Sequence, residues 1–184
     1  KLTDKYIQSI DQAQAQKESS PFLPIFSPKS IAVIGASRKV GSVGQSLLNN
    51  ILHGHFTGVV YPVNPNAESI LNHHAYRSVS NIPEKIDLAI VAVPAEAVPK
   101  VLEECGKKKI QHIILISAGF KEVGNNKLQK QLEDVIKKYK LKVIGPNALG
   151  VFDTHSKIDS MFLPRFRMSR PKEGGISFVC QSGA

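Results

Sequence analysis

The chain has 184 residues, a formal net charge of +9 and two cysteines, so it can hold one complete domain and part of another. No apolar run is long enough for a membrane helix and the first residues lack the apolar core of a signal peptide, so we expect a cytoplasmic protein that does not use a membrane. The basic residues are scattered and do not alternate with aromatic ones, which argues against a nucleic-acid partner, and the two cysteines have no metal-site spacing.

Residues 1–26 are predicted to form an amino-terminal extension. Helical spacing of Leu2, Tyr6, Ile7 and Ile10 predicts a short helix within the polar residues 1–20. The next stretch, SSPFLPIFSPKS, carries three prolines and is typical of an extended connector.

A regular alternation of strands and helices follows. Short, nearly all-apolar, β-branched stretches predict strands at residues 30–35, 58–65, 86–94, 110–120 and 141–147. Stretches with helical periodicity lie between them, at residues 44–54, 95–108 and 125–140. This pattern predicts an α/β fold with a doubly wound, Rossmann-like parallel sheet that is buried on both faces, over residues 27–150.

The pattern breaks after residue 150. Residues 151–173 contain two prolines and several basic residues and are predicted to form a connector. Residues 174–184, GGISFVCQSGA, then predict a new strand that ends in a Ser-Gly turn. We interpret this last segment as the start of a second domain that is cut off, which would leave Ile176, Phe178 and Val179 exposed.

The stretch SIAVIGASRKVGSVG, residues 30–44, carries the first functional signal. An apolar strand ends at Gly35, a loop with Arg38 and Lys39 follows, and Gly41 and Gly44 lead into a helix. The free N–H groups and the positive dipole end of a helix N-terminus make such a turn a typical phosphate site. The alternative is a structural turn whose polar residues face water, and the turn by itself does not decide between the two.

Two classes of nucleotide fit this turn poorly. The dinucleotide fingerprint G-x-G-x-x-G needs glycines closer together than Gly35 and Gly41, and an acidic residue at the end of the second strand, where this sequence has Asn64 and Pro65. A Walker A loop requires Gly-Lys-Ser/Thr, which the chain lacks. The longer basic loop and its serines favour a ligand with several phosphate groups.

Six strand-end motifs occur in order along the chain: SIAVIGAS, YPVNP, IDLAIVAVP, ISAGF, IGPNALG and ISFVCQSGA. Together they resemble the α-subunit part of the NDP-forming (ADP-forming) acyl-CoA synthetases, the acetate–CoA ligases, which are related to succinyl-CoA synthetase. The resemblance covers residues 24–184. It implies a Rossmann-like CoA-binding domain followed by a flavodoxin-like ligase domain, with coenzyme A as the ligand.

The resemblance also implies which residues contact CoA, at the carboxyl ends of the strands. The first loop would wrap the phosphates, the second strand would border the adenosine, and the third and fourth strands would line the rest of the groove. The implied residues are Gly35, Ala36, Ser37, Arg38, Lys39 and Val40 for the phosphates, Val63, Asn64 and Pro65 for the adenosine, and Val93, Pro94, Ser117, Ala118 and Gly119 for the groove.

In this family ATP phosphorylates a histidine, the phosphate passes to a carboxylate, and the CoA thiol displaces it to give the thioester. The resemblance implies that Asn147 approaches the reacting centre and that Ser182 and Gly183 open a helix facing the phosphohistidine. The catalytic histidine and the ATP-grasp part, a β-subunit or fused domain that takes ATP and Mg²⁺, would lie outside these residues. The chain alone is therefore expected to bind CoA but not to ligate it to the small carboxylic acid substrate.

Two alternatives remain open from the sequence. Some proteins of this family carry a fused lysine acetyltransferase domain and act as regulatory CoA or acyl-CoA sensors, and nothing in these residues separates them from ligases. An NAD(H)-binding redox module is disfavoured by the loop length and by the missing acidic residue.

Overall fold

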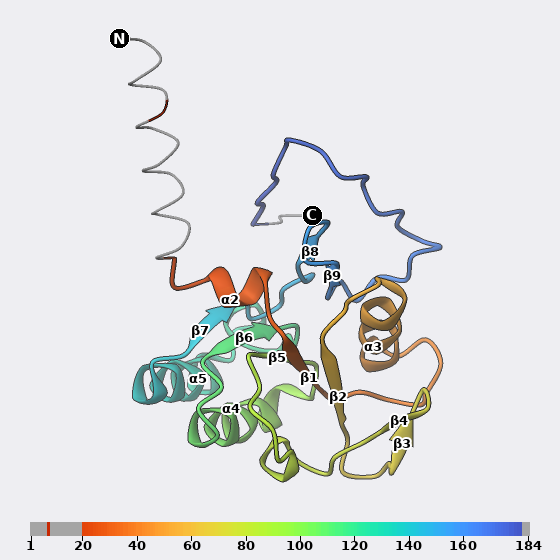
Figure 1. The fold of residues 1–184 in the computed structure, drawn as a ribbon. Helices are drawn as coiled ribbons and strands as arrows, with labels where there is room; N and C mark the ends of the chain where they lie inside the picture. The colour runs from red at the N-terminus through yellow and green to blue at the C-terminus, as the bar shows by residue number, and fades with distance from the viewer. Residues whose placement is uncertain (1–6, 8–19, 182–184) are drawn as a thin grey trace.

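The computed structural model describes residue 7 and residues 20–181, so the helix expected within residues 1–20 lies almost wholly outside the described residues. A five-stranded parallel sheet forms the centre of the fold (Figure 1). All five strands predicted from the sequence form, each shorter than its apolar run. They are β1 (Ser30–Ile34), β2 (Val59–Val63), β5 (Leu88–Val91), β6 (His112–Leu115) and β7 (Lys142–Ile144).

The order of the strands confirms the predicted doubly wound sheet. In space they follow one another as β2-β1-β5-β6-β7. The chain runs outward from β1 to the edge strand β2, returns past β1 to β5, and continues outward through β6 to β7. The neighbours β1 and β5 therefore mark the switch point, where the winding direction reverses.

Three longer helices cover the sheet, and each has a local start signal. Ser42 caps the first by accepting a hydrogen bond from the Gln45 amide at 3.3 Å, and Asn125 caps the third by accepting one from the Leu128 amide at 3.2 Å. Pro99 lies in the first turn of the second, where its missing N–H needs no partner. The helices are α3 (Val43–His53), α4 (Val98–Lys107) and α5 (Asn126–Tyr139).

The sheet has an apolar core on each face, because alternate strand residues point to opposite sides. On one face α4 and α5 pack together, and their Leu102 and Leu132 join Ala89 and Ile113 of the strands in one cluster. On the other face α3 contributes Leu47, Leu48 and Ile51 to a second cluster with Ile31 and Ile90. Burial on both sides explains why the strands are apolar throughout instead of alternating.

Short elements complete the chain. The hairpin of β3 (Ser69–Ile70) and β4 (His73–His74) lies beside the edge strand β2. One 3₁₀ turn precedes β5, and one precedes each of the helices α4 and α5, which lie before and after β6 in the chain. They are η1 (Val79–Asn81), η2 (Ala95–Ala97) and η3 (Lys121–Val123).

The segment predicted to be a connector after residue 150 contains structure that the sequence did not indicate. A hairpin of β8 (Phe152–Asp153) and β9 (Ile158–Asp159) lies beside α3 (Figure 1). Ile158 is fully buried in the α3 core. Asn50, buried in α3, donates to the carbonyls of Met161 and Leu163 at 2.7 and 3.0 Å. The segment therefore covers part of the α3 side of the sheet, where a regular α/β fold would have a further helix.

Two sequence expectations about regular structure were wrong. The proline-rich connector contains a short helix, α2 (Leu23–Phe26), because Ile25 packs fully buried into the α3 core and Pro24 fits a first helical turn. The expected strand near the carboxyl end is absent from residues 174–181, where no neighbouring strand pairs with them. Ile176, Phe178 and Val179 are at least 86% exposed there.

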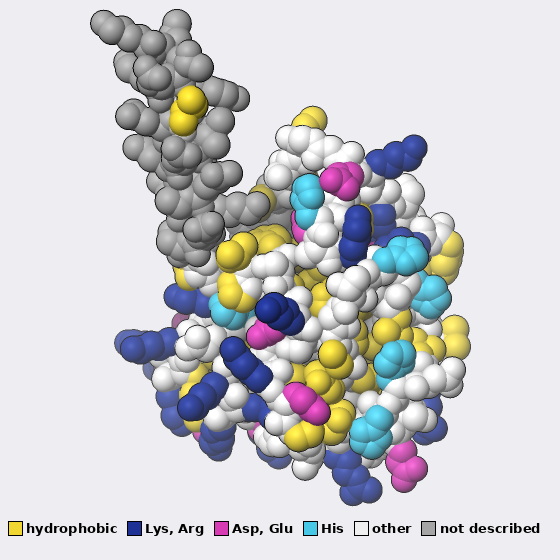
Figure 2. Space-filling model, viewed as in Figure 1, with side chains coloured by type: hydrophobic (Ala, Val, Ile, Leu, Met, Phe, Trp, Pro, Cys, Tyr) yellow, Lys and Arg dark blue, Asp and Glu magenta, His cyan; other side chains and the backbone are white. Residues whose placement is uncertain are grey.

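The positive charge is spread over the surface. Figure 2 shows Lys and Arg side chains scattered among apolar and polar ones on the face in view. Lys107 and Lys137 lie in the last turns of α4 and α5, where positive charge interacts favourably with the helix dipole. No helix among the described residues combines the length and the apolar content that crossing a bilayer requires.

One fully buried carboxylate ties the carboxyl-terminal segment together. Asp159 accepts hydrogen bonds from Arg170 Nε at 3.0 and 3.1 Å and contacts Arg165 Nη2 at 2.9 Å. The side chain of Arg170 is 5% exposed, and its two terminal nitrogens donate to the carbonyls of Met168 and Leu163. Every charge in this cluster that is buried therefore has partners.

Substitution of Asp159 by Asn should destabilise the protein by about 3 kcal/mol or more, because it leaves a buried arginine without a counter-charge. The free energy of unfolding in urea measures the loss. Glu173→Gln is the matched control, since it removes a carboxylate that faces His155 at 3.5 Å on the surface and should change stability by less than about 1 kcal/mol. Equal losses in the two variants would contradict this view of the cluster.

Candidate functional site

The carboxyl ends of the five parallel strands meet at one edge of the sheet. In doubly wound sheets ligands bind at this edge, in the crevice between the two strands at the switch point. Here those two strands are β1 and β5, which are followed by the loop of residues 35–42 and the loop of residues 92–94. We call these segments the first loop and the third loop.

Two glycines set how closely the first loop packs. Gly35 has a φ of +93°, and a Cβ there would lie 2.2 Å from the Ala92 carbonyl oxygen. A Cβ at Gly44, in the first turn of α3, would lie 1.9 Å from the Gly35 carbonyl oxygen. The backbones of β1, the third loop and α3 therefore approach one another at distances that only glycine permits.

The first loop leads directly into the N-terminus of α3. Its serine hydroxyls are used inside the loop: Ser37 Oγ accepts from the Lys39 amide at 3.1 Å, and Ser42 Oγ donates to the Lys39 carbonyl at 2.7 Å. Arg38, Lys39 and Val40 are exposed, Val40 to 85%. The loop therefore presents two cationic side chains beside the positive end of a helix, which is the arrangement that anionic ligands favour.

The end of β2 is joined to the first loop through Asn64. Its Nδ2 donates to the Ala36 carbonyl at 2.7 Å, its Oδ1 accepts from the Asn66 amide at 2.8 Å, and its own amide donates to the Tyr76 carbonyl at 2.9 Å. Val63 is buried and Pro65 is exposed. The bonds to Ala36 and Tyr76 are long-range, so no local sequence signal could have indicated them.

The ends of β5 and β6 are joined in a similar way. Ser117 Oγ donates to the Val93 carbonyl at 2.6 Å and accepts from the Val93 amide at 3.1 Å. Pro94 and Ala118 are exposed next to this pair. Gly119 has a φ of +114°, and a Cβ there would lie 2.9 Å from the Ala95 Cβ, so this turn also depends on glycine.

A carboxylate that the sequence analysis did not single out lies at this turn. Glu122 Oε1 accepts from the amides of Gly119 and Phe120 at 2.6 and 3.2 Å. The hydrogen bond from the Gly119 amide lowers the pKa of Glu122, so this side chain is ionised at neutral pH. It fixes the turn after β6 from within the chain.

The loop after β7 carries Asn147. Its amide donates to the Ser117 carbonyl at 2.9 Å, and its side chain is exposed. Gly145, with a φ of +115°, packs its Cα against the Leu115 carbonyl, and the Gly145–Pro146 peptide is cis. Asn147 therefore lies at the same edge of the sheet as the predicted CoA contacts.

The structure brings all but two of the predicted site residues to one edge of the sheet. The predicted CoA contacts lie at the ends of β1, β2, β5 and β6, and Asn147 lies after the end of β7. Ser182 and Gly183 lie outside the described residues, so their predicted role stays a prediction.

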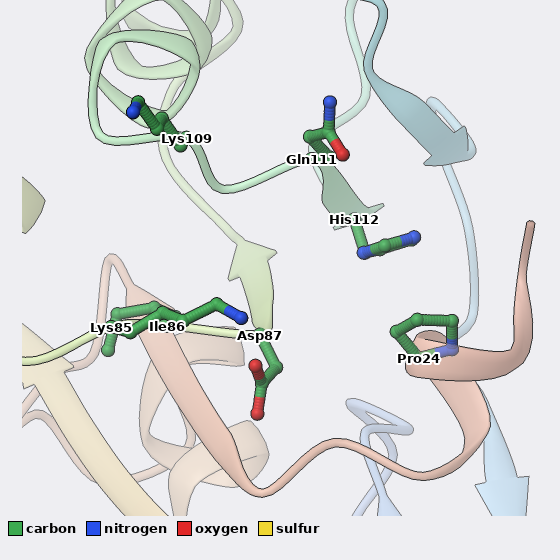
Figure 3. A pocket seen from close by; sticks show the side chains of 7 residues that line it. All are labelled: Pro24, Lys85, Ile86, Asp87, Lys109, Gln111 and His112. Carbon is green, nitrogen blue, oxygen red and sulfur yellow. The ribbon is translucent and has the colours of Figure 1, made fainter.

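Other chemistry-bearing groups lie away from this edge. A cavity of about 140 Å³ opens at the opposite, amino-terminal edge of the sheet (Figure 3). Lys85 and Asp87, which precede β5, line it together with Pro24 of α2 and His112 of β6. A second cavity, of about 270 Å³, lies beside the β8–β9 hairpin.

The described residues contain no group of three or more His, Cys, Asp or Glu side chains that could hold a metal ion. Burial raises the pKa of the Cys105 thiol to about 12, so this cysteine is a core residue and no nucleophile at neutral pH. Cys180 is exposed near the carboxyl end of the described chain. The geometry thus defines a class of protein: a doubly wound α/β domain with a basic, glycine-containing loop and a helix N-terminus at its switch point.

Comparison with known proteins gives the family. Residues 29–154 match the family described as CoA binding domain. This match covers more than half of the chain, and the chain belongs to that family.

Curated relatives extend the match. The ADP-forming 4-hydroxybutyrate–CoA ligase of Nitrosopumilus maritimus is 50% identical over 163 residues, 88% of this chain and 23% of the relative. The α-subunit of ADP-forming acetate–CoA ligase I of Pyrococcus furiosus is 39% identical over 166 residues, 87% of this chain and 35% of the relative. The chain therefore spans only a minor part of the relatives that it matches.

A solved structure agrees in fold. The dinucleotide-forming acetyl-coenzyme A synthetase 1 of Candidatus Korarchaeum cryptofilum, solved with phosphate and ADP, superposes with a TM-score of 0.75 at 36% identity. The superposition covers 78% of this chain and 31% of that one. The family resemblance found in the sequence motifs is thereby confirmed.

Substitution of Gly44 by Ala should lower the free energy of unfolding by about 3 kcal/mol, because the new Cβ displaces the Gly35 carbonyl and with it the contact between α3 and β1. Gly41→Ala is the matched control in the same loop. Nothing lies within 4 Å of a Cβ at Gly41, so only its φ of +80° opposes the change, at about 1 kcal/mol. Urea unfolding of both variants checks the difference, and a larger loss for Gly41→Ala would refute the packing argument.

Proposed function

We propose that the crevice between the first and third loops binds coenzyme A. The observation that carries the proposal is the first loop itself: two glycines hold it against the start of α3, and Arg38 and Lys39 extend from it into solvent. CoA is a polyanion with three phosphate groups, and this loop combines cationic side chains with a helix N-terminus. The match to the CoA binding domain family supports the same ligand.

The contact residues follow the loops. Gly35, Ala36, Ser37, Arg38, Lys39 and Val40 surround the phosphates. Val63, Asn64 and Pro65 border the adenosine. Val93, Pro94, Ser117, Ala118 and Gly119 line the remaining groove, where the exposed apolar groups of Pro94 and Ala118 suit the pantetheine arm.

The whole protein, on this proposal, is an ADP-forming acid–thiol ligase that joins a small carboxylic acid to CoA at the expense of ATP. The relatives are named as CoA ligases or synthetases, which favours a ligase over an acetyltransferase fusion or a redox module. Residues 1–26 form an extension, residues 27–150 the CoA-binding domain, residues 151–173 the connector and residues 174–184 the start of a flavodoxin-like domain.

The chemistry of ligation belongs to other parts of the protein. Asn147, Ser182 and Gly183 approach the phosphorylated histidine of the ligase domain. ATP and Mg²⁺ bind to an ATP-grasp part, a β-subunit or fused domain; the name of the Pyrococcus relative, an α-subunit, supports such a partner. We place the enzyme in the cytoplasm, where CoA and ATP are both present.

Calorimetric titration of the 184-residue chain should show CoA binding and no comparable binding of NAD⁺. The first loop is too long for the dinucleotide fingerprint, and Asn64 stands where an NAD-binding protein has an acidic residue. Tight binding of NAD⁺ without binding of CoA would overturn the proposal.

The double substitution Arg38→Ala with Lys39→Ala should weaken CoA binding by about 100-fold or more, since charge-assisted hydrogen bonds to phosphate contribute about 1.5–3 kcal/mol each and every 1.4 kcal/mol is about tenfold. If these side chains hold the 3′-phosphate, dephospho-CoA should lose less. The matched control, Lys107→Ala with Lys137→Ala, removes the same charge from the last turns of α4 and α5 and should leave both affinities within about twofold. Equal losses in the two double variants would show that only net charge matters.

A further inference from the structure

Hydrogen bonds join the loops at the carboxyl edge of the sheet to their neighbours, and at the switch point the Ala92 amide of the third loop donates to the Ile34 carbonyl of β1 at 2.8 Å. Asn64 joins the end of β2 to the first loop, Ser117 joins the end of β6 to the third loop, and the Asn147 amide joins the end of β7 to Ser117. Within the described part of the chain, no side-chain hydrogen bond joins the first loop to the third. The side chain of Asn64 thus holds the first loop, and the side chain of Ser117 holds the third loop.

The amide of Asn64 is oriented by its two partners. Nδ2 faces the Ala36 carbonyl, which can only accept, and Oδ1 faces the Asn66 amide, which can only donate. A flipped side chain would lose both hydrogen bonds. Both polar atoms of the Asn64 amide are therefore hydrogen-bonded within the protein. The bond to Ala36 fixes the first loop just before its basic residues.

The hydroxyl of Ser117 is likewise hydrogen-bonded within the protein. Its single proton goes to the Val93 carbonyl and one of its lone pairs accepts from the Val93 amide. The residue is 8% exposed. A hydroxyl that is buried and already bonded to both polar groups of one residue holds the backbone of Val93, which carries the exposed Pro94 in the crevice wall.

We propose that Asn64 and Ser117 are positioning residues for CoA, which act through the first and third loops and not through direct contact by their side chains. This deepens the proposed function and rests on it, because the two loops are the walls of the proposed CoA crevice. It replaces the contact role that the family resemblance implied for these two side chains.

Two variants isolate the hydrogen bonds. Asn64→Ala removes both hydrogen bonds of the side chain without adding a charge beside the proposed phosphate site, and Ser117→Ala removes both bonds to Val93. Each should weaken CoA binding by about tenfold, the factor that corresponds to one lost internal hydrogen bond or somewhat more. Ser117→Thr keeps the hydroxyl and should restore most of the affinity.

Amide hydrogen exchange without ligand separates positioning from contact. In Asn64→Ala, exchange should accelerate at residues 36–42, and in Ser117→Ala it should accelerate at Val93, whose amide loses its partner. Each effect should stay on its own side of the switch point. Asn81→Ala and Ser80→Ala, exposed residues of η1, are the matched controls and should change neither exchange in the loops nor CoA affinity.

The outcomes are distinct. Weaker CoA binding with unchanged exchange in the ligand-free chain would make these side chains contacts and overturn the inference. Faster exchange with unchanged CoA affinity would also overturn it, because the two loops would then bind CoA equally well without the hydrogen bonds from Asn64 and Ser117. Failure of the unsubstituted chain to bind CoA would refute the proposed function. Exchange in the variants would still show whether Asn64 and Ser117 hold the two loops in place.

Discussion

The close approach of backbones at the switch point is the constraint on which this structure depends. Gly35 lies against the Ala92 carbonyl, and Gly44 lies against the Gly35 carbonyl, at separations that leave no room for a Cβ. These two contacts place the start of α3 directly over the end of β1 and beside the third loop. The helix N-terminus, the basic loop and the opposite wall of the crevice are therefore fixed relative to one another before any ligand arrives.

The same helix is held at its far end by the segment after β7. Asn50 of α3 binds the carbonyls of Met161 and Leu163, and Ile158 packs into the α3 core. Buried Asp159, paired with Arg165 and Arg170, keeps this segment folded against the helix. Because both ends of α3 are fixed, the irregular segment after the sheet contributes to the geometry of a loop at the opposite end of the helix.

The described ionisable side chains at the carboxyl edge of the sheet suit the binding of an anion. They include the cations Arg38 and Lys39 and the carboxylate of Glu122, which is occupied by two backbone amides. The buried thiol of Cys105, with its pKa near 12, lies in the core between the sheet and its helices. This distribution agrees with the proposed binding of CoA at this edge of the sheet.

The sequence by itself determined the five strands of the sheet, the three long helices and the family, because apolar periodicity and strand-end motifs are local signals. It also placed Gly35, Arg38 and Asn147 at one edge of the sheet, since parallel strands end together. Only the tertiary structure decided the strand order, the hairpin at residues 152–159, the short helix at residues 23–26 and the partners of Asn64 and Ser117. These depend on contacts between residues distant in the chain: α2, with its buried Ile25, packs against β6, Ile158 is buried beside α3, and the side chains of Asn64 and Ser117 bind carbonyls 28 and 24 positions away.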